Sequence, residues 1–397
     1  MRILVISATF PSPVDPNRGV FVKERIKALS ELDQFKVKVI APVPWFPPIP
    51  IFKSWHKWSQ VPTQAEIEGL EVHYTRYLLP PKIGGYFHSE LMYRSVLPLA
   101  KKLRKDFDFD LIDSHFVYPS GVVAAKLAAH FAKPVTMTGR GEDMLSFPNH
   151  PVVGDRIRWA LSRSSKCIGV SREIADAMLA NRAAPEKTTV LANGIDSSKF
   201  QLLSQPECRA RLKLPADRQI ILSVGEMIPR KGFELLLEAM PSVIAKYPDV
   251  LLVIVGRAGR FGRDNTSALQ TKIEELALQN HVLLPGPCPH DELVLWFNSA
   301  DLFGLMSASE GSPNVLLEAL ASGTPSMATP VGGIPDELAD NQLGILLPER
   351  SSEAASVGIC EGLGRNWDRV YISEKMKERT WTSVAQRFAQ LLEEAKD

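Results

Sequence analysis

Short apolar runs alternate with amphipathic stretches along this chain, and that alternation constrains its fold more than any other feature. Arg2–Ser7 is a short apolar run that predicts a buried strand. Val20–Leu32 places apolar residues on one stripe and predicts a helix, and Val37–Pro42 predicts a second strand. A strand, a helix and a strand in this order favour a doubly wound α/β sheet with parallel strands.

The alternation starts again in the second half of the chain. Residues 197–217 are polar and irregular and predict a linker, after which Gln219–Val224 predicts a strand and Phe233–Lys246 a helix. A chain of 397 residues is long enough for two or three domains. We therefore expect two successive α/β domains, over 1–196 and 197–380. Ligands of such sheets bind at the carboxyl ends of the strands, and between two domains that face each other.

The net charge of the chain is +1, which argues against a general nucleic-acid binder. Residues 1–196 carry 26 Lys/Arg and 19 Asp/Glu, a net charge of +7, and the remainder carries 20 and 26, a net charge of −6. A basic first half suggests an anionic partner, such as a membrane surface or an anionic acceptor. Unevenly distributed solvated charge is the alternative.

Cysteine usage and the absence of apolar segments indicate a cytoplasmic protein. The four cysteines are scattered and show no spacing typical of a metal site or a disulfide framework. The acidic residues at 106–110 precede a strand in a Lys-rich setting and predict solvated charge, so we expect no metal. The first apolar run is too short for a signal peptide, and no run of about twenty apolar residues exists to span a membrane.

Residues 43–65 mix Trp and Phe with Lys, His and Pro, and residues 82–87 add Lys82, Tyr86 and Phe87. Aromatic and basic side chains in loops are typical of contacts with a membrane interface. The alternative is a surface loop that buries its aromatic side chains against its own domain. The first interpretation predicts peripheral contact with an anionic membrane.

Two carboxylates, Glu310 and Glu318, flank the predicted start of a helix. Between them Ser312 can cap a helix and Pro313 suits the first helical position, and Gly323 follows where the helix should end. This places Glu310 in the loop and Glu318 about one and a half turns into the helix. The unpaired backbone N–H groups of a helix start attract phosphate. The stretch therefore predicts a phosphate site between two acids.

A second loop, Gly225–Gly232, follows a predicted strand and contains Arg230 and Lys231. It is similar to a P-loop, but Arg230 stands where the second glycine should be, and Gly232 replaces the Ser or Thr that would hold magnesium. We therefore reject a nucleotide hydrolase. Two adjacent cations beside a helix start can neutralise a diphosphate leaving group, and an exposed Lys/Arg pair is the alternative.

Polar residues also follow two predicted strands of the first half. His115 stands at the end of one strand, where it can face a cleft, although a hydrogen-bonded core histidine is the alternative. Gly139–Asp143 ends the next strand with glycines that let the backbone approach a ligand, and a plain turn is its alternative.

These residues together resemble the GT-B retaining glycosyltransferases of family 4, also called glycosyl transferases group 1, over nearly the whole chain. The most specific motif is an acid, seven residues and a second acid, here Glu310 and Glu318. The other matching segments are Ser307–Ser309, Arg230–Gly232, Asn193–Asp196, Val331–Pro335 and Trp381–Ala385.

The resemblance implies roles for individual residues. Glu318 would hold the ribose hydroxyls of a nucleotide sugar, and Glu310 would contact its sugar. Arg230 and Lys231 would stabilise the leaving diphosphate, and His115 would lie near the donor sugar. The further donor-binding residues that the resemblance implies are Gly19, Arg140, Asp143, Gly286, Gly311, Ser312, Pro313, Asn314 and Val315. The sequence departs from the family where Asn17-Arg18-Gly19 replaces two adjacent glycines, and where Arg140 replaces a common His.

The resemblance also implies the architecture and the reaction. We expect two Rossmann-like domains facing across a cleft, with the acceptor on 1–196, the donor on 197–380 and a C-terminal helix over 381–397 that returns to the first domain. The enzyme would be a retaining hexosyltransferase that uses a UDP- or GDP-linked sugar and no cofactor. The basic first half favours a lipid-linked or other anionic glycan acceptor in bacterial polysaccharide or glycolipid synthesis, at the inner face of the membrane.

Two other classes stay open. A GT-B nucleotide-sugar epimerase or hydrolase would use the same donor site without an acceptor. A non-catalytic scaffold of a polysaccharide assembly complex would need the fold alone, and the intact Glu310, Arg230, Lys231 and Glu318 argue against it.

Overall fold

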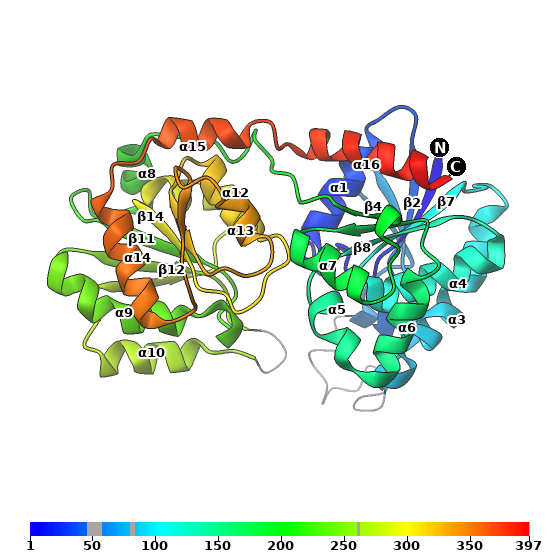
Figure 1. Cartoon of the computed structure of the whole chain (residues 1–397), viewed down its shortest axis with the longest axis horizontal. Helices are drawn as coiled ribbons and strands as arrows, with labels where there is room; N and C mark the ends of the chain where they lie inside the picture. Colours follow the sequence, from blue (N-terminus) through cyan, green and yellow to red (C-terminus); the bar gives the residue numbers. More distant parts are fainter. Residues whose placement is uncertain (46–57, 80–83, 260–262, 397) are drawn as a thin grey trace. The chain divides into compact units, whose positions relative to one another are not determined.

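The computed structural model of the chain describes residues 1–45, 58–79, 84–259 and 263–396 (Figure 1). The chain forms two compact units. Unit 1 contains residues 1–194 together with 381–397, and unit 2 contains residues 195–380. The division after residue 194 lies close to the boundary at 196 that the sequence predicts.

Unit 1 is built on an eight-stranded sheet with the strand order β10-β9-β8-β7-β1-β2-β5-β4. Neighbouring strands are parallel except for β4 and β5, which form an antiparallel pair at one edge. The strands are β1 (Arg2–Ile6), β2 (Lys36–Ile40), β4 (Gln64–Ile67), β5 (Leu70–His73), β7 (Leu111–His115), β8 (Val135–Gly139), β9 (Lys166–Gly169) and β10 (Thr188–Val190), and a separate two-stranded sheet joins β3 (Val43–Trp45) to β6 (Arg76–Leu78).

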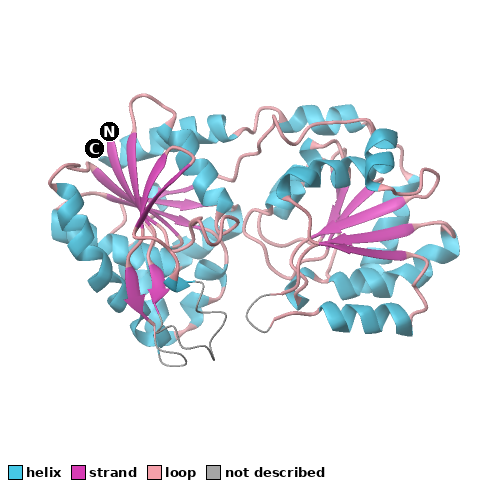
Figure 2. Cartoon of the chain, turned by 180° about the vertical axis from the view of Figure 1, so that it is seen from behind, coloured by secondary structure: helices cyan, strands magenta, loops and turns pink. Residues whose placement is uncertain are grey.

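Helices cover both faces of this sheet, as Figure 2 shows. Because side chains alternate along a strand, Ile3 and Val5 pack under α1 and α16, while Leu4 and Ile6 pack under the other helices. The helices of unit 1 are α1 (Val20–Ser30), α3 (Gly84–Arg104), α4 (Val122–Phe131), α5 (Glu142–Leu145), α6 (Pro151–Leu161), α7 (Arg172–Ala180) and α16 (Trp381–Lys396). The predicted strands and helices of this half appear within a few residues of their expected ends, but the sequence analysis did not identify α3.

Helix α16 belongs to unit 1, although it is the last element of the chain. It packs against α1 and also contacts β8 and β9. Its buried side chains, among them Phe388 and Leu392, form one core with the apolar residues of α1. The C-terminal helix therefore completes one face of the N-terminal sheet.

Unit 2 is built on a six-stranded parallel sheet with the order β13-β12-β11-β14-β15-β16. Alternate residues of β11 and β12 again serve two cores, one on each face. The strands are β11 (Ile220–Val224), β12 (Leu251–Val255), β13 (Val282–Gly286), β14 (Leu302–Leu305), β15 (Ser326–Ala328) and β16 (Gly344–Leu346). The helices are α8 (Gln205–Leu212), α9 (Phe233–Lys246), α10 (Thr266–Glu275), α11 (Leu293–Ser299), α12 (Asn314–Ala321), α13 (Ile334–Glu337), α14 (Ser352–Gly364) and α15 (Arg369–Met376).

The predicted linker over 197–217 is wrong, because this stretch contains α8 and belongs to unit 2. Helix α8 has no strong apolar stripe for the sequence to show. It is anchored by the buried guanidinium of Arg209, which donates to the backbone carbonyls of Ser299, Ala216 and Arg218 and to the Asp301 carboxylate. Because α8 is held by a polar side chain and not by an apolar stripe, its sequence is typical of a linker.

Among the described residues, no helix has both the length and the apolar composition that crossing a membrane requires.

We predict that Phe388→Ala destabilises unit 1 by about 3–5 kcal/mol, the usual cost of removing a fully buried Phe side chain. Phe388 is fully buried in the core shared by α16 and α1. Urea denaturation of the full chain measures the change. Phe87→Ala is the matched control, because Phe87 is 57% exposed, and its unfolding midpoint should stay near that of the wild type. Equal midpoints for both variants would contradict the role of α16.

Candidate functional site

The two loops that the sequence singled out meet at the carboxyl edge of the unit 2 sheet. One follows β11 and contains the short helix Pro229–Lys231, and the other follows β14 and contains Glu310. Because β11 and β14 are neighbouring parallel strands, their carboxyl ends lie side by side. Lys231 Nζ donates to Glu310 Oε1 at 2.6 Å, and Arg230 Nη1 lies 3.5 Å from the same oxygen. The structure therefore brings three of the four predicted catalytic residues together.

The surroundings of Glu310 favour the ionised form of its carboxyl. Burial alone would raise the pKa of this carboxyl, but the charges of Lys231 and Arg230 and hydrogen bonds from Lys231 and Ser307 outweigh it and hold the pKa below its ordinary value. The Ser307 hydroxyl donates to Glu310 Oε1 at 2.6 Å. The side chains of Glu310 and Lys231 are only 10% and 13% exposed, whereas that of Arg230 is 36% exposed. Arg230 is thus the more accessible cation.

Two glycines permit the close approach of the backbone that shapes this site. Gly232 has a φ of +69°, and a Cβ there would lie 2.1 Å from the carbonyl oxygen of Met306. Gly332 has a φ of +63°, and a Cβ there would lie 1.9 Å from the carbonyl oxygen of Glu310. A side chain at Gly232 would push the loops after β11 and β14 apart, and a side chain at Gly332 would push the loop after β15 away from the backbone of Glu310.

Helix α12 begins at Asn314, after the short loop that follows Glu310, and its first residues differ from the prediction. Its N-cap residue is Pro313, which offers no side-chain cap, so the prediction that Ser312 occupies the cap position is wrong. The reason is that the helix starts one residue later than expected, at Asn314, which places Ser312 outside it. Gly311–Pro313 form the loop before the helix, and Asn314 and Val315 form its first turn. Backbone N–H groups at a helix start are the groups that bind anions in proteins.

Glu318 lies inside α12, as predicted, and its carboxylate is held quite differently from that of Glu310. It is 6% exposed, and its Oε1 lies 3.0 Å from His290 Nε2. Its Oε2 is buried and has no hydrogen-bond partner among the described residues. Gly286, which ends β13 with a φ of +84°, begins the segment that leads to His290. One carboxylate oxygen of Glu318 therefore lacks a hydrogen-bond donor.

Four predicted site residues belong to unit 1, and three of them are buried in a polar network. His115 ends β7 and is fully buried, and its Nδ1 accepts from Arg140 Nε at 3.2 Å. Desolvation lowers the pKa of His115 to about 4, against the opposing charge of Asp113. Arg140 also donates from Nη1 to Asn193 Oδ1 at 3.1 Å. The structure thus shows His115 as a hydrogen-bonded core histidine, the alternative that the sequence left open.

Asp143 and Gly19 shape the backbone of unit 1. The carboxylate of Asp143 accepts from the backbone N–H groups of Val117, Arg140 and Gly141 at 2.7–3.0 Å. Burial raises the pKa of Asp143 despite these hydrogen bonds. Gly19 precedes α1 with a φ of +66°, and a Cβ there would lie 2.3 Å from the carbonyl oxygen of Thr9. Ligand contacts of Gly19, Arg140, Asp143 and His115 stay predictions.

Several polar residues that hold these groups were not predicted from the sequence. Ser307 and His290 contact the two acids, and the fully buried Arg25 donates from Nη2 to Leu191 O and Asn193 Oδ1. Arg25 lies on the apolar stripe of α1, three residues after Val22 and one before Ile26, so a charged residue on a buried stripe was the available signal. For His290 the sequence offers no comparable signal.

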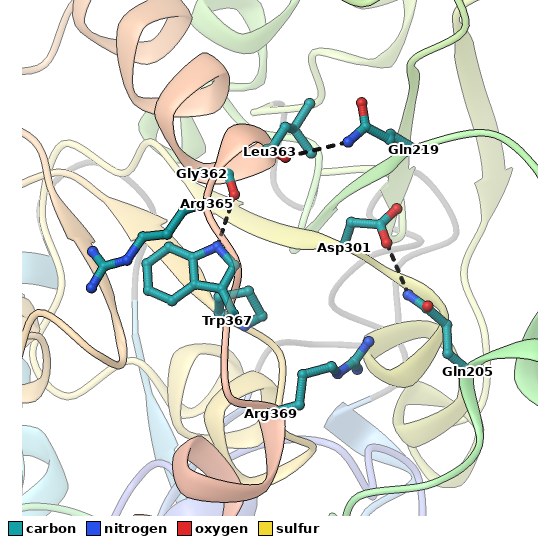
Figure 3. A pocket seen from close by; sticks show the side chains of 9 residues that line it. Gln205, Gln219, Asp301, Gly362, Leu363, Arg365, Trp367 and Arg369 are labelled. Carbon is teal, nitrogen blue, oxygen red and sulfur yellow. Dashed lines mark hydrogen bonds between the residues drawn. The ribbon is translucent and has the colours of Figure 1, made fainter.

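A cavity of about 170 Å³ lies at the opposite, amino edge of the same sheet. Gln219, Asp301 and Pro325, which line it, directly precede β11, β14 and β15. Figure 3 shows the amide of Gln205 directed at Asp301 and the indole of Trp367 directed at a backbone carbonyl, with donor–acceptor distances of 3.1 and 2.8 Å. Because its polar groups bond to one another, this cavity is not the candidate site.

We predict that the ionised Glu310 makes unit 2 sensitive to acid. Its folded-state pKa lies below the ordinary value of 4.5, so its contribution to stability is present above that pH and is lost as the pH falls through the folded-state pKa. Between about pH 5 and pH 3 the free energy of unfolding should therefore fall less steeply in Glu310→Gln than in the wild type. Urea denaturation at stepped pH measures this slope. The exposed Glu361→Gln is the control, and equal slopes in all three proteins would contradict the prediction.

Two family models match the chain in succession. Glycosyltransferase Family 4 matches residues 19–199, and Glycosyl transferases group 1 matches residues 204–379. The chain is similar to the putative teichuronic acid biosynthesis glycosyltransferase TuaC of Bacillus subtilis, with 29% identity over 366 residues, 90% of this chain and 88% of that protein. It is also 35% identical to the D-inositol 3-phosphate glycosyltransferase of Segniliparus rotundus over 180 residues, which cover 44% of this chain and 40% of that protein.

Solved structures show the same fold. Sucrose-phosphate synthase from Thermosynechococcus elongatus superposes with a TM-score of 0.78 at 20% identity, covering 99% of this chain and 98% of that chain. Anabaena HepE in complex with UDP superposes with a TM-score of 0.73 at 21% identity, covering 99% of this chain and 100% of that chain. With its two α/β units, its paired acids and its cationic loop, the chain belongs to the GT-B glycosyltransferases of family 4, the glycosyl transferases group 1, and is a glycosyltransferase.

Proposed function

We propose that this enzyme transfers a sugar from a UDP- or GDP-linked donor, with retention at the anomeric carbon, to a lipid-linked or other anionic glycan. The observation that carries the proposal is the set of groups around Glu310, in which two cations contact a buried carboxylate and the start of α12 follows in the chain. Such a set fits a diphosphate that leaves with added negative charge and a sugar whose hydroxyls need an acceptor.

In the proposed reaction the bond between the anomeric carbon and the diphosphate oxygen breaks, and a bond to the acceptor oxygen forms on the same face. The acceptor hydroxyl gives its proton to the leaving phosphate oxygen. Arg230, Lys231 and the backbone N–H groups at the start of α12 neutralise the developing charge, so the step needs no cofactor in this proposal. Glu310 accepts hydrogen bonds from the donor sugar, and Glu318 accepts from the ribose.

The relatives support the donor and acceptor classes. Anabaena HepE has been solved with UDP and with UDP-glucose, which supports a uridine nucleotide donor. The name of the Bacillus subtilis relative places it in teichuronic acid biosynthesis, which supports an acceptor in polysaccharide synthesis. A nucleotide-sugar epimerase or hydrolase is the second candidate, and product analysis without an acceptor separates it by an isomerised donor or free sugar.

We predict that Lys231→Ala lowers turnover roughly 10–150-fold with saturating donor, since one charge-assisted contact contributes about 1.5–3 kcal/mol. Lys231→Arg should retain more activity, because it keeps the charge beside Glu310. Steady-state assays of sugar transfer measure both variants, with the exposed Lys101→Ala as the matched control. An unchanged turnover for Lys231→Ala would remove Lys231 from the reaction.

We also propose that the enzyme acts at the cytoplasmic face of a membrane and contacts it through unit 1. Of the aromatic and basic stretches, residues 46–57 and 80–83 lie outside the described residues, and Trp58 contradicts the membrane interpretation, because it is 3% exposed beneath Arg18. Leu78 and Phe87 support the proposal, since they are 48% and 57% exposed. Their neighbours Tyr77 and His88 stack at 5.3 Å, which places the end of β6 beside the start of α3.

We predict that replacing Leu78 and Phe87 together by Ser weakens binding to anionic vesicles by at least about tenfold, because burying each side chain contributes about 1.5–3 kcal/mol. Vesicle flotation with and without anionic lipid measures binding. The control replaces Val357 and Val370 by Ser, two residues of unit 2 that are 68% and 58% exposed. Wild-type protein that floats with neither kind of vesicle would contradict membrane contact.

A further inference from the structure

We infer that Lys199 and His290 are positioning residues for Glu318, and that they prepare its free carboxylate oxygen for a ribose hydroxyl. The inference rests on the proposed function, in which Glu318 binds the ribose of the donor. It adds residues from two other segments, the stretch before α8 and the loop after β13, to that binding site.

The hydrogen bonds fix which ring nitrogen of His290 carries the proton. Lys199 Nζ lies 3.2 Å from His290 Nδ1, and a lysine ammonium can only donate, so Nδ1 is the acceptor. The proton of the neutral ring then sits on Nε2, which lies 3.0 Å from Glu318 Oε1 and donates to it. Lys199 therefore determines that His290 presents a donor, not an acceptor, to Glu318.

The ring is also held in place by packing. Phe200 is 2% exposed, and its ring meets that of His290 edge-on with 5.4 Å between centroids. The backbone N–H of Phe200 donates to the carbonyl of Asp196 at 2.8 Å, which fixes the turn that presents Lys199. Lys199 also forms an ion pair with Asp291, the residue after His290. These contacts restrain both ends of the Lys199–His290 pair.

The two oxygens of Glu318 consequently differ. Oε1 accepts from His290, whereas Oε2 is buried and has no partner in the described parts of the chain. A buried carboxylate oxygen without a donor is costly, and a ligand hydroxyl that donates to it removes that cost. Without His290 the carboxylate could rotate, and both oxygens would compete for the same ligand hydroxyl.

Calorimetric titration of the full chain with UDP, GDP and ADP tests the inference without requiring the acceptor. For the diphosphate that the wild type binds, His290→Ala and Lys199→Met should each raise Kd about 3- to 30-fold, as expected when an oriented hydrogen bond to a carboxylate is lost. His290→Gln should restore most of the affinity, because its amide nitrogen can donate where Nε2 does. Lys246→Met is the matched control, since it removes the charge of an exposed lysine at the end of α9, outside the segments that hold Glu318, and its Kd should stay near that of the wild type.

A ligand without ribose hydroxyls separates positioning from general damage to the fold. For the 2′,3′-dideoxy form of the same diphosphate, His290→Ala and Lys199→Met should bind as the wild type does, and in a Glu318→Ala background His290→Ala should cost nothing further. Equal losses for both ligands, or unchanged Kd values for both variants, would overturn the inference while leaving the proposed function intact. Wild-type protein that binds none of the three diphosphates would overturn both.

Discussion

The pairing of β11 with β14 in one parallel sheet is the constraint on which the candidate site depends. Their carboxyl ends are adjacent, so the loop with Arg230 and Lys231 and the loop with Glu310 meet although about 80 residues separate them. The contact is reinforced at the backbone, where Ala308 N–H donates to the carbonyl of Arg230 at 2.8 Å. Gly232 permits this approach, since a Cβ there would collide with the carbonyl oxygen of Met306. Gly332, in the loop after β15, permits a similar approach to the backbone of Glu310. The cation–carboxylate geometry thus follows from strand order and from the close approach at Gly232.

Within that frame the two acids are held by different contacts, and this difference suits different tasks. Glu310 is compensated by Lys231 and Arg230, so a diphosphate that draws the cations toward itself also frees Glu310 to accept from a sugar. Among the described residues Glu318 has no Lys or Arg within salt-bridge distance, and its close side-chain contact is with the ring of His290. Because Oε2 of Glu318 has no partner among the described residues, this oxygen can accept a hydrogen bond from a neutral donor such as a hydroxyl.

The sequence was sufficient where local periodicity and turn chemistry decide the structure. Helix α12, the position of Glu318 inside it and the left-handed Gly323 at its end follow from apolar spacing and a terminal glycine, and all are confirmed. Prediction from the sequence failed where tertiary contacts override the local pattern. Helix α8 is held by Arg209, a buried cation whose partners lie elsewhere in the chain. The start of α12 moved by one residue, and no pattern in the sequence places Lys199 beside His290.

The buried polar network of unit 1 likewise depends on contacts between residues far apart in the chain, which a local sequence pattern does not show. Two guanidinium groups, those of Arg25 and Arg140, share Asn193, and desolvation lowers the pKa of Arg25 to about 10. Burying such charges is expensive, and the expense is offset only if many partners are held in register. Phe388 of α16 helps to hold them, since its ring lies 5.7 Å from the guanidinium of Arg25 and 6.3 Å from the ring of His115. The last helix therefore does more than close an apolar face, because its Phe388 also packs against the guanidinium of Arg25 and the ring of His115.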